Sequence, residues 1–255
     1  MTWENKVVIV TGAGGGIGRS VAQRFASAGA AVVAVGRTHS KVQDVADEIA
    51  NAGGRAVAMA ADVSSEEDVT RVIGDTYRAF GRIDVMVNNA AVCPQVRLTD
   101  MSLTEWNGVI TNNLTSVFLF CRGVIPYMLE QGGGAIVNVS SVHALATLDG
   151  YSAYSASKAG IVGLTRAIAL DYAKNNIRVN AVLPGAVRTP MLESSVKNLD
   201  TPRDEIMKQW DQSQPIGRVG QPEEIASVVL FAASPENSFM TGTTLVADGG
   251  MTAEL

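Results

Sequence analysis

Short runs of β-branched and aliphatic residues alternate along the chain with longer stretches in which apolar positions recur at helical spacing. The short runs are continuously apolar, which is typical of strands buried on both faces of a parallel sheet. Seven such runs predict strands at 6–11, 31–36, 56–61, 83–88, 135–140, 177–182 and 243–248. The stretches between them predict helices near 17–28, 40–52, 65–80, 103–130, 153–174 and 222–233.

The alternation of strands with helices predicts βαβ units, and therefore a mainly parallel sheet with helices on both faces. Nothing in the chain has the composition of a linker or a repeat, so we expect a single domain over 1–255. One long polar stretch, 188–216, fits no strand–helix unit and carries helix-like patches in its middle. An insertion of this length in a compact domain is usually a functional lid or loop. We expect it to cover a bound substrate.

The composition narrows the class of protein. A length of 255 residues with 47% apolar and 18% charged residues suits one large packed α/β domain. A net charge of −5 and the lack of a Lys/Arg run argue against a nucleic-acid surface. The apolar stretches fall short of the roughly 20 residues that a bilayer requires, so no membrane span is expected.

The start of the chain and its cysteines predict a compartment. The stretch "MTWENKVVIVTG" lacks the basic start and long apolar region of a signal peptide. The two cysteines, Cys93 and Cys121, provide no disulfide framework. We therefore expect a reducing, cytoplasmic location, with both cysteines as small buried apolar residues. No metal site is expected.

A glycine-rich turn, "TGAGGGIG" at 11–18, connects the first predicted strand to the first predicted helix. Glycine allows positive φ and a close approach of backbone to a ligand. The N–H groups and dipole of the following helix suit a pyrophosphate. The spacing Gly12-x-x-x-Gly16-x-Gly18 differs from the G-x-G-x-x-G of two-domain dehydrogenases. The turn predicts a dinucleotide site that comprises Gly12, Gly14, Gly15, Gly16, Ile17 and Gly18.

The end of the second strand discriminates between the two nicotinamide dinucleotides. An acidic residue there binds the ribose 2′-OH of NAD, whereas an arginine accommodates a 2′-phosphate. Here Gly36 stands where the acid would be, and Arg37 and Thr38 follow. Because a guanidinium makes strong bonds to phosphate, NADP(H) is favoured over NAD(H). The alternative is that Arg37 is a solvated surface residue.

Eight short motifs resemble, in order and in spacing, those of the short-chain dehydrogenase/reductase family. They are "TGAGGGIG" (11–18), "DV" (62–63), "NNA" (88–90), "NNL" (112–114), "VSS" (139–141), "YSASK" (154–158), "PGAVRTP" (184–190) and "DGG" (248–250). The resemblance covers nearly the whole chain and matches the compact branch of the family. It implies a Rossmann-type, doubly wound seven-stranded parallel sheet of order 3-2-1-4-5-6-7, with three helices on each face. It also implies a nicotinamide cofactor, hydride transfer to or from a carbonyl carbon, and a homotetramer.

The resemblance also assigns four catalytic residues: Asn113, Ser141, Tyr154 and Lys158. A carbonyl oxygen that gains charge during hydride delivery needs a nearby acid, which here is Tyr154. A lysine ammonium and a nicotinamide cation should lower the pKa of a tyrosine from about 10. Ser141 is expected to polarise the carbonyl, and Asn113 to hold a water that links Lys158 to solvent.

The family pattern assigns the remaining cofactor contacts. Asp62 and Val63 are expected at the adenine, Asn89 and Ala90 along the adenosine ribose, and Val187 and Thr189 at the nicotinamide carboxamide. Pro184, Gly185, Tyr154 and Lys158 complete the set. The sequence departs from the family at Ala91, where a glycine is common.

The segment "YSAYSASK" contains a second tyrosine, Tyr151, seven residues before Lys158. That spacing resembles enoyl-thioester reductases, a divergent branch that reduces C=C bonds. Tyr154, four residues before Lys158, is its direct neighbour on a helix. Because Ser141 and the glycine turn also fit carbonyl reducers, carbonyl/alcohol chemistry is favoured. Tyr151 is expected at or before the start of the helix.

The sequence leaves the substrate open. Gln95, Arg97, His143 and Asp149 predict a polar pocket for a hydroxyketone or a sugar-like alcohol, with Tyr151 at its rim. Met191 and its neighbours in 188–216 equally fit a small apolar ketone or an acyl chain. A 3-oxoacyl carrier-protein reductase is the first alternative. Its partner, an acidic carrier protein, would need a basic surface beside the site, and a net charge of −5 argues mildly against that. A non-catalytic NADP-sensing protein on the same fold is a remote one.

Overall fold

The computed structural model describes residues 2–195 and 203–253. Within them, seven strands form one parallel sheet in the order β3-β2-β1-β4-β5-β6-β7. The order is the predicted one. The strands are β1 (Val7–Thr11), β2 (Ala31–Gly36), β3 (Arg55–Ala60), β4 (Val85–Asn88), β5 (Gly134–Val139), β6 (Ile177–Pro184) and β7 (Thr244–Ala247).

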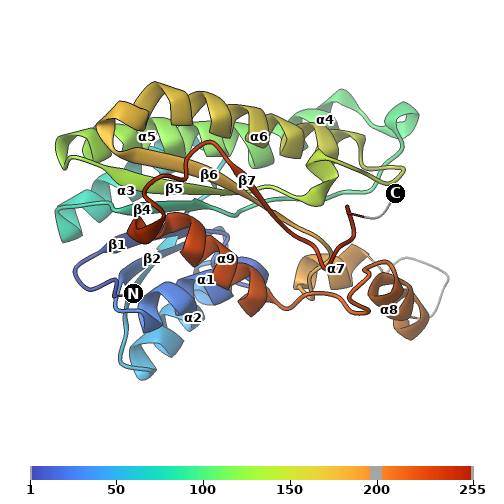
Figure 1. Ribbon diagram of the computed structural model, residues 1–255, viewed down its shortest axis with the longest axis horizontal. Helices are drawn as coiled ribbons and strands as arrows, with labels where there is room; N and C mark the ends of the chain where they lie inside the picture. The colour runs from blue at the N-terminus through green and yellow to red at the C-terminus, as the bar shows by residue number, and fades with distance from the viewer. Residues whose placement is uncertain (1, 196–202, 254–255) are drawn as a thin grey trace.

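Helices cover both faces of the sheet, as Figure 1 shows. One face carries α1 (Gly16–Ser27), α2 (His39–Asn51) and α9 (Pro222–Ala233). The opposite face carries α3 (Glu66–Phe80), α4 (Leu103–Ile110), α5 (Ser116–Glu130) and α6 (Ser152–Tyr172). Because α4 and α5 belong to one helical run, each face has three helical units, as expected.

The predicted helix 103–130 contains a π-helical turn that the sequence pattern does not reveal. This turn, Thr111–Thr115, joins α4 to α5 and holds the buried Asn113. π-turns are rare and occur frequently at functional sites. The predicted insertion 188–216 contains α7 (Pro190–Ser195) and α8 (Arg203–Gln212). Its central part, 196–202, lies outside the described residues.

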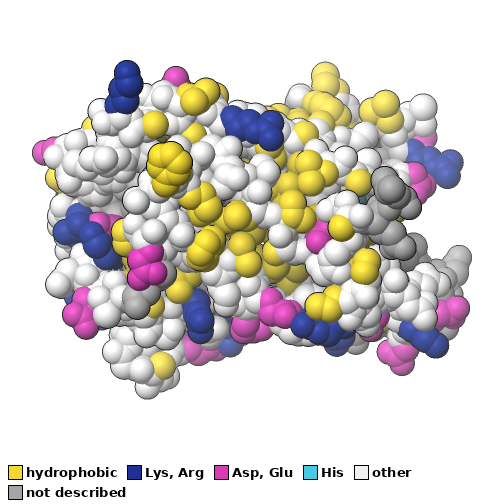
Figure 2. All heavy atoms as spheres, in the orientation of Figure 1, with side chains coloured by type: hydrophobic (Ala, Val, Ile, Leu, Met, Phe, Trp, Pro, Cys, Tyr) yellow, Lys and Arg dark blue, Asp and Glu magenta, His cyan; other side chains and the backbone are white. Residues whose placement is uncertain are grey.

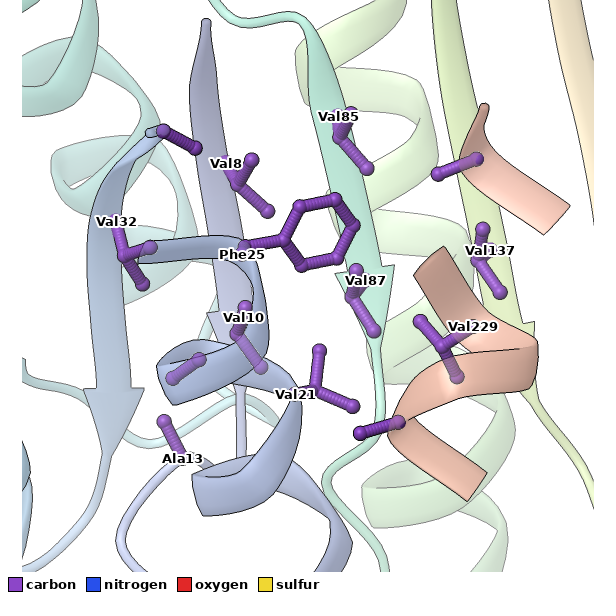
Figure 3. Packing of buried hydrophobic residues seen from close by; sticks show 14 of the residues in the cluster. Val8, Val10, Ala13, Val21, Phe25, Val32, Val85, Val87, Val137 and Val229 are labelled. Carbon is purple, nitrogen blue, oxygen red and sulfur yellow. The ribbon is translucent and has the colours of Figure 1, made fainter. Parts of the chain in front are cut away.

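Apolar layers attach the helices to the sheet. Phe25 of α1 points toward Val8, Val85 and Val87 on the neighbouring strands β1 and β4 (Figure 3). Trp3 packs edge-on against the same ring, with 5.0 Å between the ring centroids. A second cluster, centred on Met86, Phe120 and Ile136, fills the opposite face. The sheet is therefore buried on both sides, which explains its continuously apolar strands.

The run Leu103–Glu130 has the length and composition of a membrane-crossing helix, with a mean hydropathy of 1.3 over its most apolar window. Half of that window is buried within the protein. Val117, Phe120, Val124 and Met128 of this run belong to the core cluster under the sheet. Its apolar character is therefore that of a core helix.

Candidate active site

A cavity of about 430 Å³ opens at the carboxyl edge of the sheet. It lies where the strand order reverses between β1 and β4, the position at which doubly wound sheets bind ligands. Most of the predicted site residues line it: Gly12, Gly14, Gly15, Gly16, Ile17, Arg37, Thr38, Asn89, Ala90, Ser141, His143, Tyr151, Tyr154, Lys158, Pro184, Gly185, Val187, Thr189 and Met191. The residues expected there that do not line it are Gly18, Asp62, Val63, Gln95, Arg97, Asn113 and Asp149.

The glycine turn forms the floor of the cavity at the N-terminus of α1. Gly12 and Gly16 have φ of 66° and 52°, a region that L side chains rarely adopt. No side chain caps the N-terminus of α1, so the N–H groups of its first turn are available to an anion. Gly18 serves packing instead, because a Cβ there would lie 2.2 Å from the carbonyl oxygen of Gly12.

The turn after β2 forms the next part of the wall, with Gly36, Arg37, Thr38 and Lys41. A Cβ at Gly36 would lie 2.9 Å from Cγ1 of the buried Val42, so this backbone has little room for an acidic side chain. The charged side chains that line this part of the cavity are instead the cations Arg37 and Lys41. Lys41 contacts the glycine loop itself, since its Cβ lies 3.0 Å from the position of a Cβ at Gly14.

Asn89 and Thr11 fasten the end of β4 to the glycine turn. Asn89 Nδ2 donates to the carbonyl oxygen of Thr11 at 3.0 Å. The backbone N–H groups of Asn89 and Ala90 both donate to Thr11 Oγ1, at 3.0 and 3.1 Å. Sequence reasoning did not identify this role of Thr11. Ala91 is not among the described residues with positive φ, so the alanine that replaces the family's glycine causes no backbone strain.

Asp62 and Val63 do not line the cavity. Asp62 Oδ1 accepts hydrogen bonds from the N–H and the hydroxyl of Ser64, at 2.9 and 2.6 Å. These bonds, and to a smaller extent the nearby Arg37, lower the pKa of Asp62. Val63 is buried. Their contact with an adenine stays a prediction.

Gly185 brings the end of β6 against the turn that follows β7. A Cβ on Gly185 would lie 2.8 Å from Cα of Asp248. Asp248 in turn accepts bonds from the N–H groups of Gly250 and Thr252, at 2.9 and 2.8 Å. The "DGG" motif therefore shapes a turn, with φ of 64° and 90° at its two glycines.

Ser141, Tyr154 and Lys158, the residues predicted to be catalytic, line the same cavity as the glycine turn, and we call the part that they form the catalytic wall. Ser141 follows the end of β5, and the other two residues lie one turn apart on α6. Lys158 Nζ lies 5.5 Å from the centre of the Tyr154 ring and donates to the carbonyl oxygen of Val139 at 2.9 Å. Ser140, which sequence reasoning did not single out, supports Lys158 by donating to its backbone carbonyl at 2.8 Å.

Burial is the main influence on the pKa values of Lys158 and Tyr154. Burial lowers the pKa of Lys158 to about 8. It raises the pKa of Tyr154 above its usual value, which the Ser141 side chain opposes only in part. The protein alone therefore does not produce the lowered tyrosine pKa that the family chemistry suggests. Tyr154 carries its proton at neutral pH.

Asn113 lies fully buried behind the catalytic wall. Its Oδ1 accepts from the N–H of Val92 at 2.8 Å. Its Nδ2 donates to the carbonyl oxygen of Val92 at 2.9 Å and to Ser157 Oγ at 3.1 Å. These contacts give the side chain a positioning role between the loop after β4 and α6. The predicted relay of protons through a water at Asn113 stays a prediction, and the side-chain amide is already engaged.

An aromatic cluster borders the catalytic wall. The His143 ring lies 4.9 Å from that of Tyr151 and 5.4 Å from that of Tyr154, between ring centroids. Tyr151 is the N-cap residue of α6, as expected. Gln95 does not join this cluster: it is exposed, and it packs on the turn at Gly150.

The insertion and the loop after β4 supply the apolar part of the cavity. Met191, Leu192 and Trp210 line it from α7 and α8. Cys93 lines it from the loop after β4 and is only half-buried, so the expectation that both cysteines are buried is wrong for Cys93. Burial raises the pKa of the Cys93 thiol to about 12. The Cys93 thiol is therefore neutral at physiological pH and adds a largely apolar surface to the cavity lining.

Comparison with known proteins identifies the family. The family model described as "Enoyl-(Acyl carrier protein) reductase" matches residues 12–252. A 3-oxoacyl-[acyl-carrier-protein] reductase from Thermotoga maritima is 39% identical over 251 residues, which cover 98% of this chain and 99% of that protein. The chain belongs to the short-chain dehydrogenase/reductase family.

Two further members of the short-chain dehydrogenase/reductase family match over the whole length. A cyclohexanol dehydrogenase from an Acinetobacter species is 39% identical, covering 99% of this chain and 97% of that protein. The crystal structure of levodione reductase superposes with a TM-score of 0.95 at 36% identity, covering 99% of both chains. This short-chain dehydrogenase/reductase is therefore an NAD(P)-dependent oxidoreductase that acts on an alcohol or a carbonyl.

The cavity fits the cofactor of the family. The glycine turn leaves little room for a side chain at Gly12, Gly14 or Gly18, and it presents the uncapped N-terminus of α1. The cationic turn after β2 lies on the same wall. The residues that would hold a dinucleotide are thus those of the glycine turn, of the turn after β2, and of the segments at the carboxyl ends of β4, β5 and β6.

Proposed function

We propose that the protein interconverts a small ketone and its secondary alcohol, with NADP(H) as the preferred cofactor. The observation that carries this proposal is that Ser141, Tyr154 and Lys158 share one cavity with the glycine turn. The bound dinucleotide supplies or accepts the hydride. Every other requirement of the reaction falls to the side chains of the chain itself.

Tyr154 is the proton donor in the direction of reduction. Its raised pKa keeps the phenol protonated at neutral pH, so a proton is present where a ketone oxygen gains charge. Ser141 stands at the end of β5 on the same wall, where its hydroxyl can bind that oxygen. Lys158 lies against the Tyr154 ring, and its cationic form stabilises the phenolate that remains after proton transfer.

A screen of ketones and alcohols with NADPH, NADH, NADP and NAD side by side tests the proposal. We expect turnover of small ketones that disappears in Tyr154→Phe. Absence of turnover across a broad panel, with cofactor bound, would instead support the NADP-sensing alternative. A Tyr154→Phe variant as active as the wild type would show that Tyr154 is not the proton donor.

The preference for NADP(H) is supported by the turn after β2. Arg37 and Lys41 line the cavity there, and Gly36 leaves the position of the usual acid without a side chain. A 2′-phosphate would meet two cations at this position, whereas the ribose of NAD would find no carboxylate.

A 3-oxoacyl carrier-protein reductase is the second candidate. The Thermotoga maritima relative with that name is 39% identical over almost the whole chain. The apolar wall of Met191, Leu192 and Trp210 could cover an acyl chain. Comparing acetoacetyl-CoA with cyclohexanone as substrates distinguishes the two candidates, since only the acyl reductase should prefer the thioester by orders of magnitude.

We further propose a homotetramer built from two apolar surfaces. One lies over β7 and α9, where Figure 2 shows apolar side chains gathered in the middle of the face, and it exposes Phe231 and Val246. The other exposes Phe118 of α5 and Leu170 of α6. Val246→Lys and Leu170→Asp should each leave dimers, and the double variant monomers, as measured by light scattering. A wild-type monomer would contradict this proposal.

A further inference from the structure

His143 belongs to a group of hydrogen-bonding side chains next to the catalytic wall. Its Nδ1 atom lies 2.8 Å from Thr147 Oγ1. The same hydroxyl lies 2.6 Å from Ser155 Oγ on α6, and it donates to the carbonyl oxygen of Leu148 at 3.4 Å. Three contacts therefore converge on the hydroxyl of Thr147.

We assign the tautomer of His143 from the proton balance at Thr147. A threonine hydroxyl has one proton to donate and two lone pairs to accept with. The only assignment that satisfies all three contacts sends its proton to Leu148, while Ser155 and His143 Nδ1–H donate to it. In a neutral imidazole with its proton on Nδ1, the Nε2 atom is an acceptor. Burial lowers the pKa of His143, so the ring is neutral at physiological pH.

The ring is held beside the groups that bind the reacting oxygen. The backbone N–H of His143 donates to Ser141 Oγ at 3.2 Å. The imidazole meets the Tyr154 ring edge-on, with 5.4 Å between centroids and 77° between planes. Across the described residues, no hydrogen bond to Nε2 is found, whereas Nδ1 is fully engaged. Nε2 is thus the acceptor that His143 contributes to a cavity it lines.

Apart from the Tyr151 hydroxyl, the side chains that line the cavity beside the catalytic wall are mainly apolar. Val142, Met191, Leu192 and Trp210 line the cavity with apolar side chains. A good substrate therefore has an apolar body, the reacting oxygen, and one further group that can donate a hydrogen bond.

We propose that Nε2 of His143 accepts a hydrogen bond from a hydroxyl on the carbon next to the reacting carbonyl. The enzyme then prefers α-hydroxyketones, and in the reverse direction vicinal diols, over ketones that lack the hydroxyl. This inference rests on the proposed ketone reductase function and makes it more specific. Thr147 is a positioning residue that fixes the tautomer.

Three cyclic substrates test the inference: cyclohexanone, 2-hydroxycyclohexanone and 2-methoxycyclohexanone, whose ether oxygen has no proton to donate. The wild type should show a kcat/KM for 2-hydroxycyclohexanone about tenfold above that for either other compound, the size expected for one hydrogen bond. His143→Phe keeps an aromatic ring against both tyrosines but removes the acceptor, so the preference should disappear. His143→Gln restores an acceptor oxygen and should retain more of the preference than His143→Phe.

The positioning role of Thr147 has its own readout. Thr147→Val should reduce the preference for the hydroxyketone, and Thr147→Ser, which keeps the hydroxyl, should retain it. His39→Leu removes the only other histidine, at an exposed position outside the cavity, and should leave the ratio of kcat/KM values at the wild-type value.

Two outcomes overturn the inference: a preference that survives in His143→Phe, or a wild type that favours the methyl ether or shows no preference. Either result leaves the proposed function intact as long as cyclohexanone is reduced and the reduction depends on Tyr154. If no ketone is reduced, or if Tyr154→Phe is fully active, the proposed function itself fails.

Discussion

Lys158 Nζ donates a 2.9 Å hydrogen bond to the carbonyl oxygen of Val139, the last residue of β5. The bond fastens α6 to the sheet at the catalytic wall. It also leaves an ammonium in a site where the side chain is almost completely buried. A single carbonyl oxygen replaces only part of the hydration that the ammonium loses. The lowered pKa of Lys158 is the consequence of this deficit.

The lysine should therefore decrease the free energy of unfolding of the cofactor-free protein at neutral pH. The pKa of Lys158 falls from 10.5 to about 8 on folding, so between these values the unfolded state binds more protons than the folded state. Stability from this group consequently rises as the pH increases from about 8 towards 10.5, and the penalty is largest below pH 8. Lys158→Met should be more stable than the wild type at pH 7, by on the order of 1–3 kcal/mol.

Urea unfolding of both proteins from pH 7 to pH 10 measures this difference. All other titratable groups are present in both proteins, so comparing the two proteins isolates the contribution of Lys158. We expect the difference to shrink as the pH increases. A difference that is constant across the range, or that favours the wild type throughout, contradicts the prediction.

Replacing each tyrosine of "YSAYSASK" with phenylalanine should have very different effects on activity. Tyr154→Phe removes the acid next to Lys158 and should lower kcat by about 10²–10⁴-fold, the usual contribution of a general acid. Tyr151→Phe removes a hydroxyl at the N-cap position of α6 and should lower kcat by less than about tenfold. Ketone reduction by NADPH and titration of NADPH binding by fluorescence measure both effects, and binding should change little in Tyr154→Phe. If Tyr151→Phe were inactive and Tyr154→Phe active, Tyr151 would be the proton donor instead.

The strands and most helices could be predicted because each is specified by a local pattern. β1, for example, is a five-residue apolar run that is buried at every position, and the predicted 6–11 differs from it only at one end. The glycine turn could also be predicted, because Gly12 and Gly16 need backbone angles that other residues avoid. The wall residues Ser141, Tyr154 and Lys158 followed from family motifs at fixed spacing.

The contacts that no local pattern predicts join residues distant along the chain. The π-turn at 111–115 contains Asn113, whose side chain bonds Val92 and Ser157, and these residues become neighbours only in the folded protein. Cys93 reads as a core residue from its type alone, but the loop after β4 places it in the cavity wall. Asp62 and Val63 keep the spacing of the family motif although their side chains lie outside that wall.

Arg37 should be responsible for most of the preference for NADP(H). Arg37→Ala removes a guanidinium that would pair with the 2′-phosphate, so the Kd for NADPH should rise about ten- to hundredfold. The Kd for NADH should change much less, because NADH lacks that phosphate. The advantage of NADPH in the wild type should also decrease with added salt, since Arg37 is exposed to solvent. Equal losses for both cofactors would show that Arg37 only supports the turn.

Asn113 should contribute to stability as well as to the site, because its fully buried side chain joins the loop after β4 to α6. Asn113→Ala removes hydrogen bonds to both backbone groups of Val92, which is half-buried, and to the buried Ser157, and it leaves these partners without a replacement. We expect a loss of about 2–4 kcal/mol in the free energy of unfolding. Asn112→Ala is the matched control, since the neighbouring amide makes a single exposed bond to the carbonyl oxygen of Gly108 and should cost less than about 1 kcal/mol. Urea unfolding of the two variants provides the comparison, and equal losses would show that the buried bonds do not hold the π-turn and the loop after β4 together.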